Sequence, residues 1–400
     1  MTLHQAPAGT FFLHSNVVRL LLDVSAVPDR PVGAGYYTLN LATHVALRDD
    51  IETHLLCRQH DGARWEALAP GAAVHAEVPA GRPARLVWEQ TRAVTLARSN
   101  GIDVWHGPHY TMPLRLTVPA VVTVHDLTFF EHPEWHERGK VAYFRPMIRA
   151  AVRRAAAIIA VSADTAERLR QLAPPAGPIV VAPHGVDHAR FAPVVDPATD
   201  GASGDAELLA AHGIRSPYIG FTGTIEPRKD LPTLVGAFAR IAREHRALRL
   251  VIAGGDGWGS DRVRDAIAAS GVSTRILRPG YLPDAAVAPF FRRAEVVAYP
   301  SLAEGFGLNA LEALACGAPL VTTTGSALDE VVGSAALTVT PGDVEALADA
   351  LREALRPDVA ARLRAAGPER AAGFTWERSV ERHLEAYQLA ANSVGARART

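Results

Sequence analysis

The residues best suited to chemistry lie in the segment 301–319, SLAEGFGLNALEALACGAP. Its glycines Gly305 and Gly307 follow an apolar stretch and precede a helical pattern. Glycine lets a backbone approach a ligand closely, and the first N–H groups of a helix are unpaired donors, so this loop is suited to hold phosphate. Glu304 and Glu312 flank the loop. Carboxylates repel phosphate, so we expect them to accept from hydroxyl groups, one on a transferred sugar and one on a ribose. Taken alone, Glu312 would be a cap of the helix.

A second segment, 223–230 (GTIEPRKD), places two cations side by side directly after an apolar strand pattern. Lys229 is one of only two lysines in the 400 residues, and Arg228 precedes it. A planar guanidinium and a compact ammonium at the end of a strand could neutralise a diphosphate leaving group. The alternative is a solvated basic turn. The strand before the pair and Pro232 after it, a residue typical of a first helical turn, favour the functional interpretation.

Three histidines come at the ends of two neighbouring strand patterns. VVTVHDL delivers His125 and Asp126, and VWHGPHY delivers His106 and His109. Such a set raises the question of a metal. No acidic residue lies at ligand spacing and the chain has no Asp-x-Asp pair, so we predict no metal site.

The segment 32–37, VGAGYY, resembles half of a dinucleotide-binding fingerprint. The third glycine of G-x-G-x-x-G is replaced by Thr38, so the motif is weak evidence for a nicotinamide dinucleotide. Gly33 and Gly35 are better explained as residues of a loop that lines a cleft.

Parallel α/β construction would position all of these residues, because short apolar runs alternate with helical patterns along the chain. The predicted strands are 17–23, 53–57, 73–78, 104–106, 121–125, 157–161, 179–182, 218–222, 248–253, 276–278, 296–299, 320–323 and 337–339. The predicted helices include 35–47, 84–98, 140–156, 164–172, 231–243, 285–292, 309–315 and 376–389.

A proline-, glycine- and aspartate-rich stretch divides these elements into two groups, which predicts two doubly wound domains with ligand bound where the strand ends face a central cleft. The predicted boundaries are 1–192 for the first domain with a flexible tail over 1–15, 193–207 for a linker, 208–375 for the second domain, 376–390 for a helix that returns to the first domain, and 391–400 for a tail.

The composition excludes several classes of protein. A formal net charge of -1 gives no bulk attraction to nucleic acid. The two cysteines, Cys57 and Cys316, make neither a disulfide framework nor a metal cluster and suit a reducing cytosol. The N-terminal residues lack the features of a signal peptide, and no apolar run is long enough to span a membrane.

One helix face offers a route to peripheral membrane contact. Arg145, Arg149 and Arg153 recur every four residues and therefore share a face, with Arg154 beside it. In an arginine-rich chain this face could equally be solvated surface. If functional, it would dock on anionic membrane or on the phosphate of a lipid-linked acceptor.

Together these segments resemble the family-4 retaining glycosyltransferases, and the resemblance runs from Val17 to about Tyr387. It rests on VHDLTFFEHPEW, IIAVSADT, VAPHGVDHARF, GFTGTIEPRKDLPTLVGAF, LVIAGGDGWG and EGFGLNALEALACGAPLV in this order. It implies the GT-B fold, with two Rossmann-like domains. Asn309 departs from the pattern, since many relatives carry proline after GFGL.

The resemblance implies a role for each matching residue. Glu304 resembles the glutamate that holds the donor sugar, Glu312 the one that binds ribose, Arg228 and Lys229 the diphosphate clamp, and His125 the cleft histidine beside the transferred sugar. The implied catalytic residues are His125, Arg228, Lys229 and Glu304. The implied donor-binding residues are Gly33, Gly35, Gly223, Thr224, Tyr281, Leu282, Gly305, Phe306, Gly307, Leu308, Asn309 and Glu312. On the acceptor side we expect His106, His109 and Asp126.

The implied activity is a metal-independent, retaining hexosyltransferase. It would move a sugar from a nucleotide-diphospho-sugar, with mannose from GDP-mannose favoured, to a glycan or lipid-linked acceptor in cell-surface polysaccharide or glycolipid biosynthesis. No cofactor and no nucleic acid are expected, and the expected location is the cytoplasm, at the inner face of the membrane. Two alternatives remain, a nucleotide-sugar epimerase on the same fold and a non-catalytic module that binds sugar nucleotides.

Overall fold

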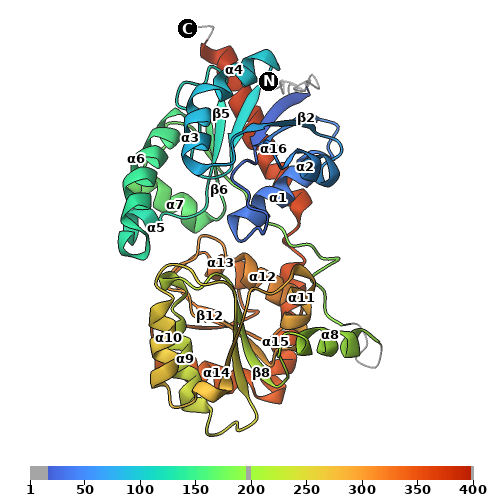
Figure 1. The fold of residues 1–400 in the computed structure, drawn as a ribbon, viewed down its shortest axis with the longest axis vertical. Helices are drawn as coiled ribbons and strands as arrows, with labels where there is room; N and C mark the ends of the chain where they lie inside the picture. Colours follow the sequence, from blue (N-terminus) through green and yellow to red (C-terminus); the bar gives the residue numbers. More distant parts are fainter. Residues whose placement is uncertain (1–16, 195–199, 398–400) are drawn as a thin grey trace, which may run out of the picture.

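The computed structural model describes residues 17–194 and 200–397 and divides them between two α/β domains (Figure 1). The predicted tail over 1–15 lies outside the described residues. Both sheets are entirely parallel, so the predicted pair of doubly wound domains is confirmed.

The first domain is built on a seven-stranded sheet in the order β3-β2-β1-β4-β5-β6-β7. Its central strands are short apolar runs that are buried along their whole length, as expected where helices cover both faces. The strands are β1 (Val18–Asp23), β2 (Ile51–Arg58), β3 (Ala73–Val78), β4 (Val104–Gly107), β5 (Ala120–Val124), β6 (Ala157–Ala160) and β7 (Ile179–Val181). The helices are α1 (Ala34–Val45), α2 (Gly62–Leu68), α3 (Arg82–Thr91), α4 (Ala93–Ser99), α5 (Thr128–Glu131), the 3-10 turn η1 (Pro133–Trp135), α6 (Arg138–Arg154) and α7 (Ala163–Leu172).

The helix predicted over 84–98 is divided into α3 and α4. The hydroxyl of Thr91 donates to the carbonyl of Val87 at 2.8 Å. A threonine hydroxyl that bonds to the preceding turn in this way bends a helix and weakens it, which accounts for the break.

The second domain is built on a six-stranded sheet in the order β10-β9-β8-β11-β12-β13. The strands are β8 (Tyr218–Thr222), β9 (Arg249–Ala253), β10 (Ile276–Gly280), β11 (Val296–Tyr299), β12 (Leu320–Thr323) and β13 (Leu337–Val339). The helices are α8 (Asp200–Ala210), η2 (Pro227–Lys229), α9 (Leu231–Ile241), α10 (Asp261–Ala269), η3 (Ser273–Arg275), α11 (Asp284–Arg293), α12 (Leu308–Ala315), α13 (Leu328–Val332), α14 (Val344–Ala354) and α15 (Pro357–Ala371).

The linker predicted over 193–207 is shorter in the structure, because α8 begins at Asp200. This helix packs against α11, where the carboxylate of Asp205 accepts from Arg292 at 2.6 and 2.7 Å and Leu209 is buried in the core of the second domain. The polar composition of this stretch indicated a linker, and the sequence did not reveal that Asp205 pairs with Arg292. The linker residues 195–199 lie outside the described part of the chain.

The last helix, α16 (Trp376–Arg397), runs back into the first domain, where it packs on α1 and along β6 and β7 (Figure 1). Residues 391–397 belong to this helix, so the predicted tail over 391–400 is wrong for them, and 398–400 lie outside the described residues. Trp376 and Tyr387 are buried in the core of the first domain. This helix explains why the chain crosses between the domains twice.

The two crossings lie side by side. The N–H of Val186 donates to the carbonyl of Phe374 at 3.2 Å. A Cβ atom on Gly185 would lie 2.2 Å from the backbone nitrogen of Trp376. The two segments that connect the domains therefore touch at a point where only glycine fits. Adjacent crossings of this kind are suited to act as a hinge between two rigid domains.

Cys57 and Cys316 are both buried and free, and they belong to different domains. Among the residues that the structure describes, no helix has the length and apolar character needed to cross a membrane.

Candidate active site

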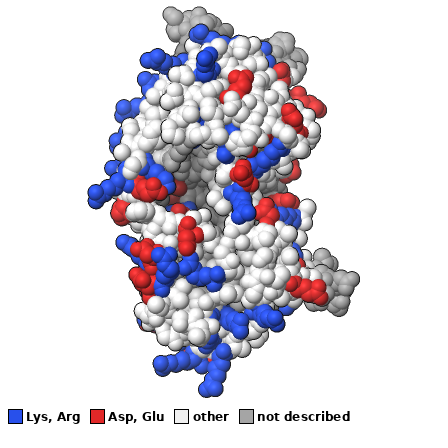
Figure 2. Space-filling model, viewed as in Figure 1, with Lys and Arg blue, Asp and Glu red and all other residues white. Residues whose placement is uncertain are grey.

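Two adjoining cavities lie between the domains, where the carboxyl ends of both sheets face each other, and Figure 2 shows this face of the molecule hollowed between the domains. The first cavity, of about 190 Å³, extends to His125 and Asp126 of the first domain. The second cavity, of about 290 Å³, extends to Tyr281 and Glu312. Residues that line both cavities are Gly33, Arg228, Lys229, Leu308 and Asn309. The two cavities therefore form one continuous site with the cations at its middle.

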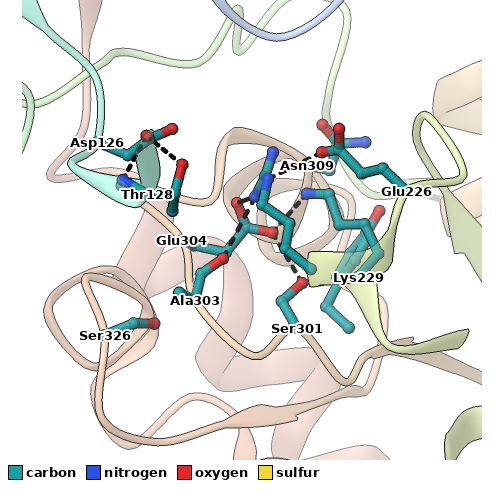
Figure 3. Close-up of polar contacts among 12 residues, drawn as sticks. Asp126, Thr128, Glu226, Lys229, Ser301, Ala303, Glu304, Asn309 and Ser326 are labelled. Atoms are coloured by element: carbon teal, nitrogen blue, oxygen red, sulfur yellow. Dashed lines mark hydrogen bonds and ion pairs between the residues drawn. The ribbon is translucent and has the colours of Figure 1, made fainter. Parts of the chain in front are cut away.

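The cations are held in place by carboxylates. Glu304 accepts from Arg228 Nη1 and from Lys229 Nζ, and its Oε1 also accepts from the Ser301 hydroxyl at 2.7 Å (Figure 3). The Nε of Arg228 lies 2.8 Å from Glu226 Oε1. Two positive and two negative charges therefore balance within this cluster.

The turn η2 presents the cations to the cleft. Asp230, directly after Lys229, has the left-handed φ of 45° and is the N-cap of α9, so η2 ends there and α9 begins. The carbonyl of Arg228 accepts from the N–H of Leu302 at 2.7 Å, which ties η2 to the loop after β11. The side chains of Arg228 and Lys229 are 21% and 13% exposed, which disfavours the alternative of a solvated basic turn.

Burial and the charge cluster set the protonation of Glu304 and Lys229. Burial alone would raise the pKa of Glu304, but the attraction of Arg228 and Lys229 outweighs it and lowers that pKa to about 2. Burial, together with repulsion from Arg228, lowers the pKa of Lys229. Glu304 is therefore an ionised acceptor at neutral pH.

The glycine loop before α12 closes the first cavity. A Cβ atom on Gly305 would lie 1.7 Å from the carbonyl oxygen of His125 in the other domain. Gly307 has a φ of 97° and is the N-cap of α12, so the unpaired N–H groups of that helix begin beside the cations. Glycine is required at both positions, at one for a close approach between domains and at the other for a left-handed backbone.

Asn309 joins this loop to the end of β8. Its Nδ2 donates to the carbonyl of Thr222 at 2.9 Å and to the hydroxyl at 3.2 Å. The same hydroxyl lies 2.7 Å from the phenol oxygen of Tyr299. The residue that departs from the family pattern thus takes part in a hydrogen-bond network under both cavities, which a proline could not join.

Glu312 faces the second cavity from the middle of α12. The N-cap of the helix is Gly307 and no acidic residue lies in its first turn, so Glu312 does not cap the helix. Burial raises the pKa of Glu312 to about 8, against the opposing attraction of Arg190. The other predicted residues of this cavity are Gly223, Thr224, Tyr281 and Leu282, and the structure brings all of them to its wall.

His125 contributes a neutral imidazole to the first cavity. Its Nε2 lies 2.7 Å from the carbonyl of Pro108, which can only accept, so Nε2 carries the hydrogen and Nδ1 is left as an acceptor. Burial lowers the pKa of His125. Asp126, beside it, accepts from the N–H of Thr128 at 3.1 Å and from its hydroxyl at 2.7 Å (Figure 3).

Three of the predicted site residues are not on the walls of these cavities. His106 is fully buried, with Nδ1 2.9 Å from the hydroxyl of Tyr387 and Nε2 2.8 Å from that of Thr123, so its place on the acceptor side is wrong. His109 lies behind His125, with their ring centroids 5.7 Å apart.

Gly35 packs against proline, since its Cβ would lie 3.2 Å from Cβ of Pro31, whereas Gly33 lines both cavities. The prediction that Gly35 contacts the donor is therefore corrected to a role in shaping the turn.

Several residues on the walls were missed. Glu226 and Arg190 stand inside segments that carried the family resemblance, so a closer look at their charges could have found them. His184 is 5% exposed and lines the first cavity, with no group in the described part of the chain bonded to its Nδ1. Tyr299, at the end of β11, lines the first cavity, whereas Ser301 lines neither cavity and supports Glu304 from behind; only the three-dimensional contacts reveal the partners of both residues.

Among the described residues, His106, His109 and His125 do not belong to a group of three potential metal ligands. The one group there with three potential ligand atoms within 4.8 Å of one another is Asp29, His60 and Asp61. None of these three lines the first or the second cavity.

The sequence matches two families of known proteins. Residues 31–190 match the family described as Glycosyltransferase Family 4, and residues 216–357 match the family described as Glycosyl transferases group 1. The chain is 32% identical over 290 residues to O-antigen chain mannosyltransferase B of Escherichia coli, covering 72% of this chain and 74% of that protein.

Two further comparisons extend this result. Over 241 residues the chain is 36% identical to D-inositol 3-phosphate glycosyltransferase of Nocardia farcinica, covering 57% of this chain and about half (52%) of that protein. The structure of Anabaena Alr3699/HepE in complex with UDP-glucose superposes with a TM-score of 0.72 at 20% identity, covering 92% of this chain and 98% of that one. At this identity the structural likeness concerns the fold.

Proposed function

Because the chain belongs to glycosyltransferase family 4, we propose that it moves a hexosyl group from a nucleotide-diphospho-sugar to a glycan or lipid-linked acceptor with retention of anomeric configuration. The observation that carries the proposal is the cluster of Arg228, Lys229 and Glu304 at the junction of the two cavities. The mannosyltransferase of E. coli supports mannose, from GDP-mannose, as the sugar, and cell-surface polysaccharide or glycolipid as the product class.

The two cavities suggest how the donor lies. The second cavity would hold the nucleoside, with Glu312 on the ribose hydroxyls and the base against Tyr281 and Leu282. The cations and the N-terminus of α12 would hold the diphosphate at the junction. The sugar would then lie in the first cavity between Glu304 and His125.

Donor binding requires an exchange of partners at the cations. Arg228 and Lys229 both donate to Glu304 in the structure, and a diphosphate would draw these donors to itself. Glu304 would then be free to accept from sugar hydroxyls, and its low pKa keeps it ionised for that task. Glu226 remains beside Arg228 and fixes the guanidinium.

The chemistry follows from these placements. The bond between the anomeric carbon and the phosphate oxygen breaks while the acceptor hydroxyl forms its bond on the same face, and the hydroxyl proton passes to the departing phosphate oxygen. The cations and the α12 amides stabilise the negative charge that develops on the diphosphate. In this complex Glu304 accepts from sugar hydroxyls and stays bonded to Ser301, and the acceptor hydroxyl itself attacks the anomeric carbon, so no nucleophilic carboxylate is invoked.

Metal independence is part of the proposal. The cations would stand where other transferases use a divalent ion, and the group of Asp29, His60 and Asp61 lies off the two cavities. We expect metal-stripped protein to keep its transfer rate in excess EDTA. A complete loss that manganese or magnesium restores would contradict this part.

A panel of nucleotides tests donor binding. Thermal unfolding is followed with GDP, UDP, ADP and dTDP and with their common sugar conjugates. Ligand at about 100 times its dissociation constant adds about 2.7 kcal/mol of stability, and we expect GDP-mannose to give the largest shift. If none of the nucleotides stabilises the protein, the proposed function fails. If another sugar nucleotide gives a larger shift than GDP-mannose, that compound becomes the proposed donor and the glycosyltransferase activity stands.

As a secondary proposal, α6 contacts anionic membrane through a basic face that no longer includes Arg145. Arg145 turns inward, where its Nε and Nη2 donate to the carbonyls of Phe129 and Phe130 at 2.6 and 2.9 Å, so it leaves the predicted face. Arg149, Arg153 and Arg154 remain exposed, and Figure 2 has basic side chains along the margin of the first domain where α6 lies.

Each basic residue near an anionic surface contributes about 1 kcal/mol. Wild type should therefore sediment with anionic liposomes at low salt, and Arg149→Glu/Arg153→Glu should not. Equal sedimentation of the two proteins would show that this face of α6 does not bind membrane.

A further inference from the structure

A third cavity, of about 640 Å³, opens between the domains on the side of η1 and α6. The second domain contributes Trp258 to its wall, and the first domain contributes Glu134, His136 and Arg138. Trp258 is 56% exposed, and among the described residues no other aromatic ring lies against it. An exposed indole on the wall of a cavity marks a place where a ligand can cover it.

The backbone holds Trp258 in this place. The N–H of Gly257 donates to the carbonyl of Ile225 at 2.9 Å. A Cβ atom on Gly257 would lie 2.8 Å from that oxygen, and one on Gly259 would lie 3.0 Å from Cγ of Pro227. These two glycines let the loop that carries Trp258 pack closely against residues 225–227, so the backbone at Trp258 is anchored beside the segment that leads to Arg228 and Lys229.

A chain of hydrogen bonds joins the third cavity to the first. The Thr128 hydroxyl donates to Asp126 at 2.7 Å, so it accepts from Nε2 of His136, which lies 3.0 Å away. Asp126 lines the first cavity and His136 lines the third. Burial lowers the pKa of His136, which leaves Nδ1 of a neutral ring as an acceptor. The side chain of Thr128 thus links a wall residue of the first cavity to one of the third, so the two cavities lie near each other.

We propose that the third cavity is a saccharide subsite, in which a sugar ring of the acceptor stacks its C–H face on Trp258 while its hydroxyls bond to Glu134, His136 and Arg138. The inference rests on the proposed transferase function and specifies its acceptor as a glycan of at least two rings. One ring would receive the sugar in the first cavity, and the next would occupy the third.

The polar groups of the cavity favour a neutral sugar over a phosphate. The Nε and Nη2 of Arg145, which also lines the cavity, already donate to the carbonyls of Phe129 and Phe130. Arg138 is exposed, and the nearby carboxylate of Glu134 repels an anion. A carboxylate, a neutral imidazole and a guanidinium around an indole are groups that bind hydroxyls and the apolar face of a sugar ring.

Saturation-transfer NMR with defined sugars tests the subsite. The probes are the methyl glycosides of mannose, glucose, galactose, rhamnose and N-acetylglucosamine, together with α-linked di- and trisaccharides of the same sugars. The proteins are wild type, Trp258→Ala and Trp258→Phe, with Leu47→Ala as a control that truncates an apolar side chain 76% exposed elsewhere. Thermal shift with the nucleotide that wild type binds shows whether each variant keeps its donor site.

We expect wild type to bind at least one oligosaccharide more tightly than the matching methyl glycoside. Trp258→Ala should weaken the binding of that oligosaccharide about tenfold, or about 1.4 kcal/mol, because an aromatic side chain covered by ligand carries a large share of the binding energy. Trp258→Phe and Leu47→Ala should retain the preference, and all variants should bind the nucleotide as wild type does. If wild type has no preference for oligosaccharides, or Trp258→Ala keeps it, the subsite is overturned; failure of nucleotide binding in wild type would instead contradict the transferase function.

Discussion

At Glu304, a single carboxylate accepts from Arg228, Lys229 and Ser301 at once, and the same two cations are the groups that a diphosphate would need. We predict that Glu304→Gln and Lys229→Ala each lower turnover about 10²–10³-fold, because each removes a charge that is already in position. Initial rates of transfer at saturating donor measure the effect. Lys140→Ala is the matched control, since the only other lysine pairs with Glu137 at 2.6 Å on α6. Near-normal turnover in either folded variant would remove that residue from the active site.

The low pKa of Glu304 predicts a pH dependence of stability. The pKa of this carboxyl falls from its ordinary 4.5 to about 2 in the folded protein, so its contribution to stability is fully present above pH 4.5 and is lost as pH falls through 2. At pH 7 the contribution is about 3 kcal/mol, of which about 2 kcal/mol disappears between pH 5 and pH 3. Urea unfolding at a series of pH values should give a shallower acid slope for Glu304→Gln than for wild type. Parallel slopes would contradict the ion cluster.

Most of the residues predicted for the site line the two cavities, because strand ends and glycine loops can be recognised from local sequence patterns. The sequence predicted Glu304, Arg228 and His125, which line the first cavity. It could not separate His125 from His106, since both follow apolar strands and only the packing of α16, through Tyr387, buries His106. The inward turn of Arg145 depends likewise on the carbonyls of α5, a tertiary contact that helical spacing does not reveal.

Among the elements, strands were predicted best because buried parallel strands are short apolar runs with clear ends. The observed bounds of β8, β11, β12 and β13 are those predicted. The failures lie where a polar surface hides a packed element. The start of α8 and the end of α16 are examples, since their composition indicated a linker and a tail.

The loop before α12 carries a prediction at the scale of elements. Gly305→Ala places a methyl group against the carbonyl of His125, and Thr165, whose hydroxyl donates to the carbonyl of Gly305 at 3.2 Å, would lose this contact. We expect the domains to stand further apart and turnover to fall about 10²-fold, because misplacement by about 1 Å costs that much. Small-angle scattering and transfer rates measure the two effects.

Gly81→Ala is the control for this substitution, since nothing lies within 4 Å of its Cβ position. Folding should persist in both variants, because Gly305 lies at the surface between domains. A Gly305→Ala protein with wild-type scattering and turnover would show that the close approach is not needed.

The two domains contact each other at several places around the cleft, so the molecule is in a closed form. Glu330 of α13 accepts from the N–H groups of Ala163 and Asp164 at the start of α7, at 2.8 and 2.6 Å. Tyr36 of α1 donates to Asp284 at the start of α11. With the two crossings adjacent at Val186 and Phe374, the closed form has contacts that a hinge motion can break and remake.

The anomeric configuration of the first product tests the central claim most directly. Metal-stripped wild type is mixed in EDTA with the donor that the nucleotide panel selects and with a saccharide acceptor, and the new anomeric proton is followed by NMR from the earliest time. The account predicts that the transferred sugar keeps the configuration it had in the donor, and that Lys229→Ala forms this product far more slowly. A product of inverted configuration, or conversion of the donor to an epimer with no transfer, would contradict it.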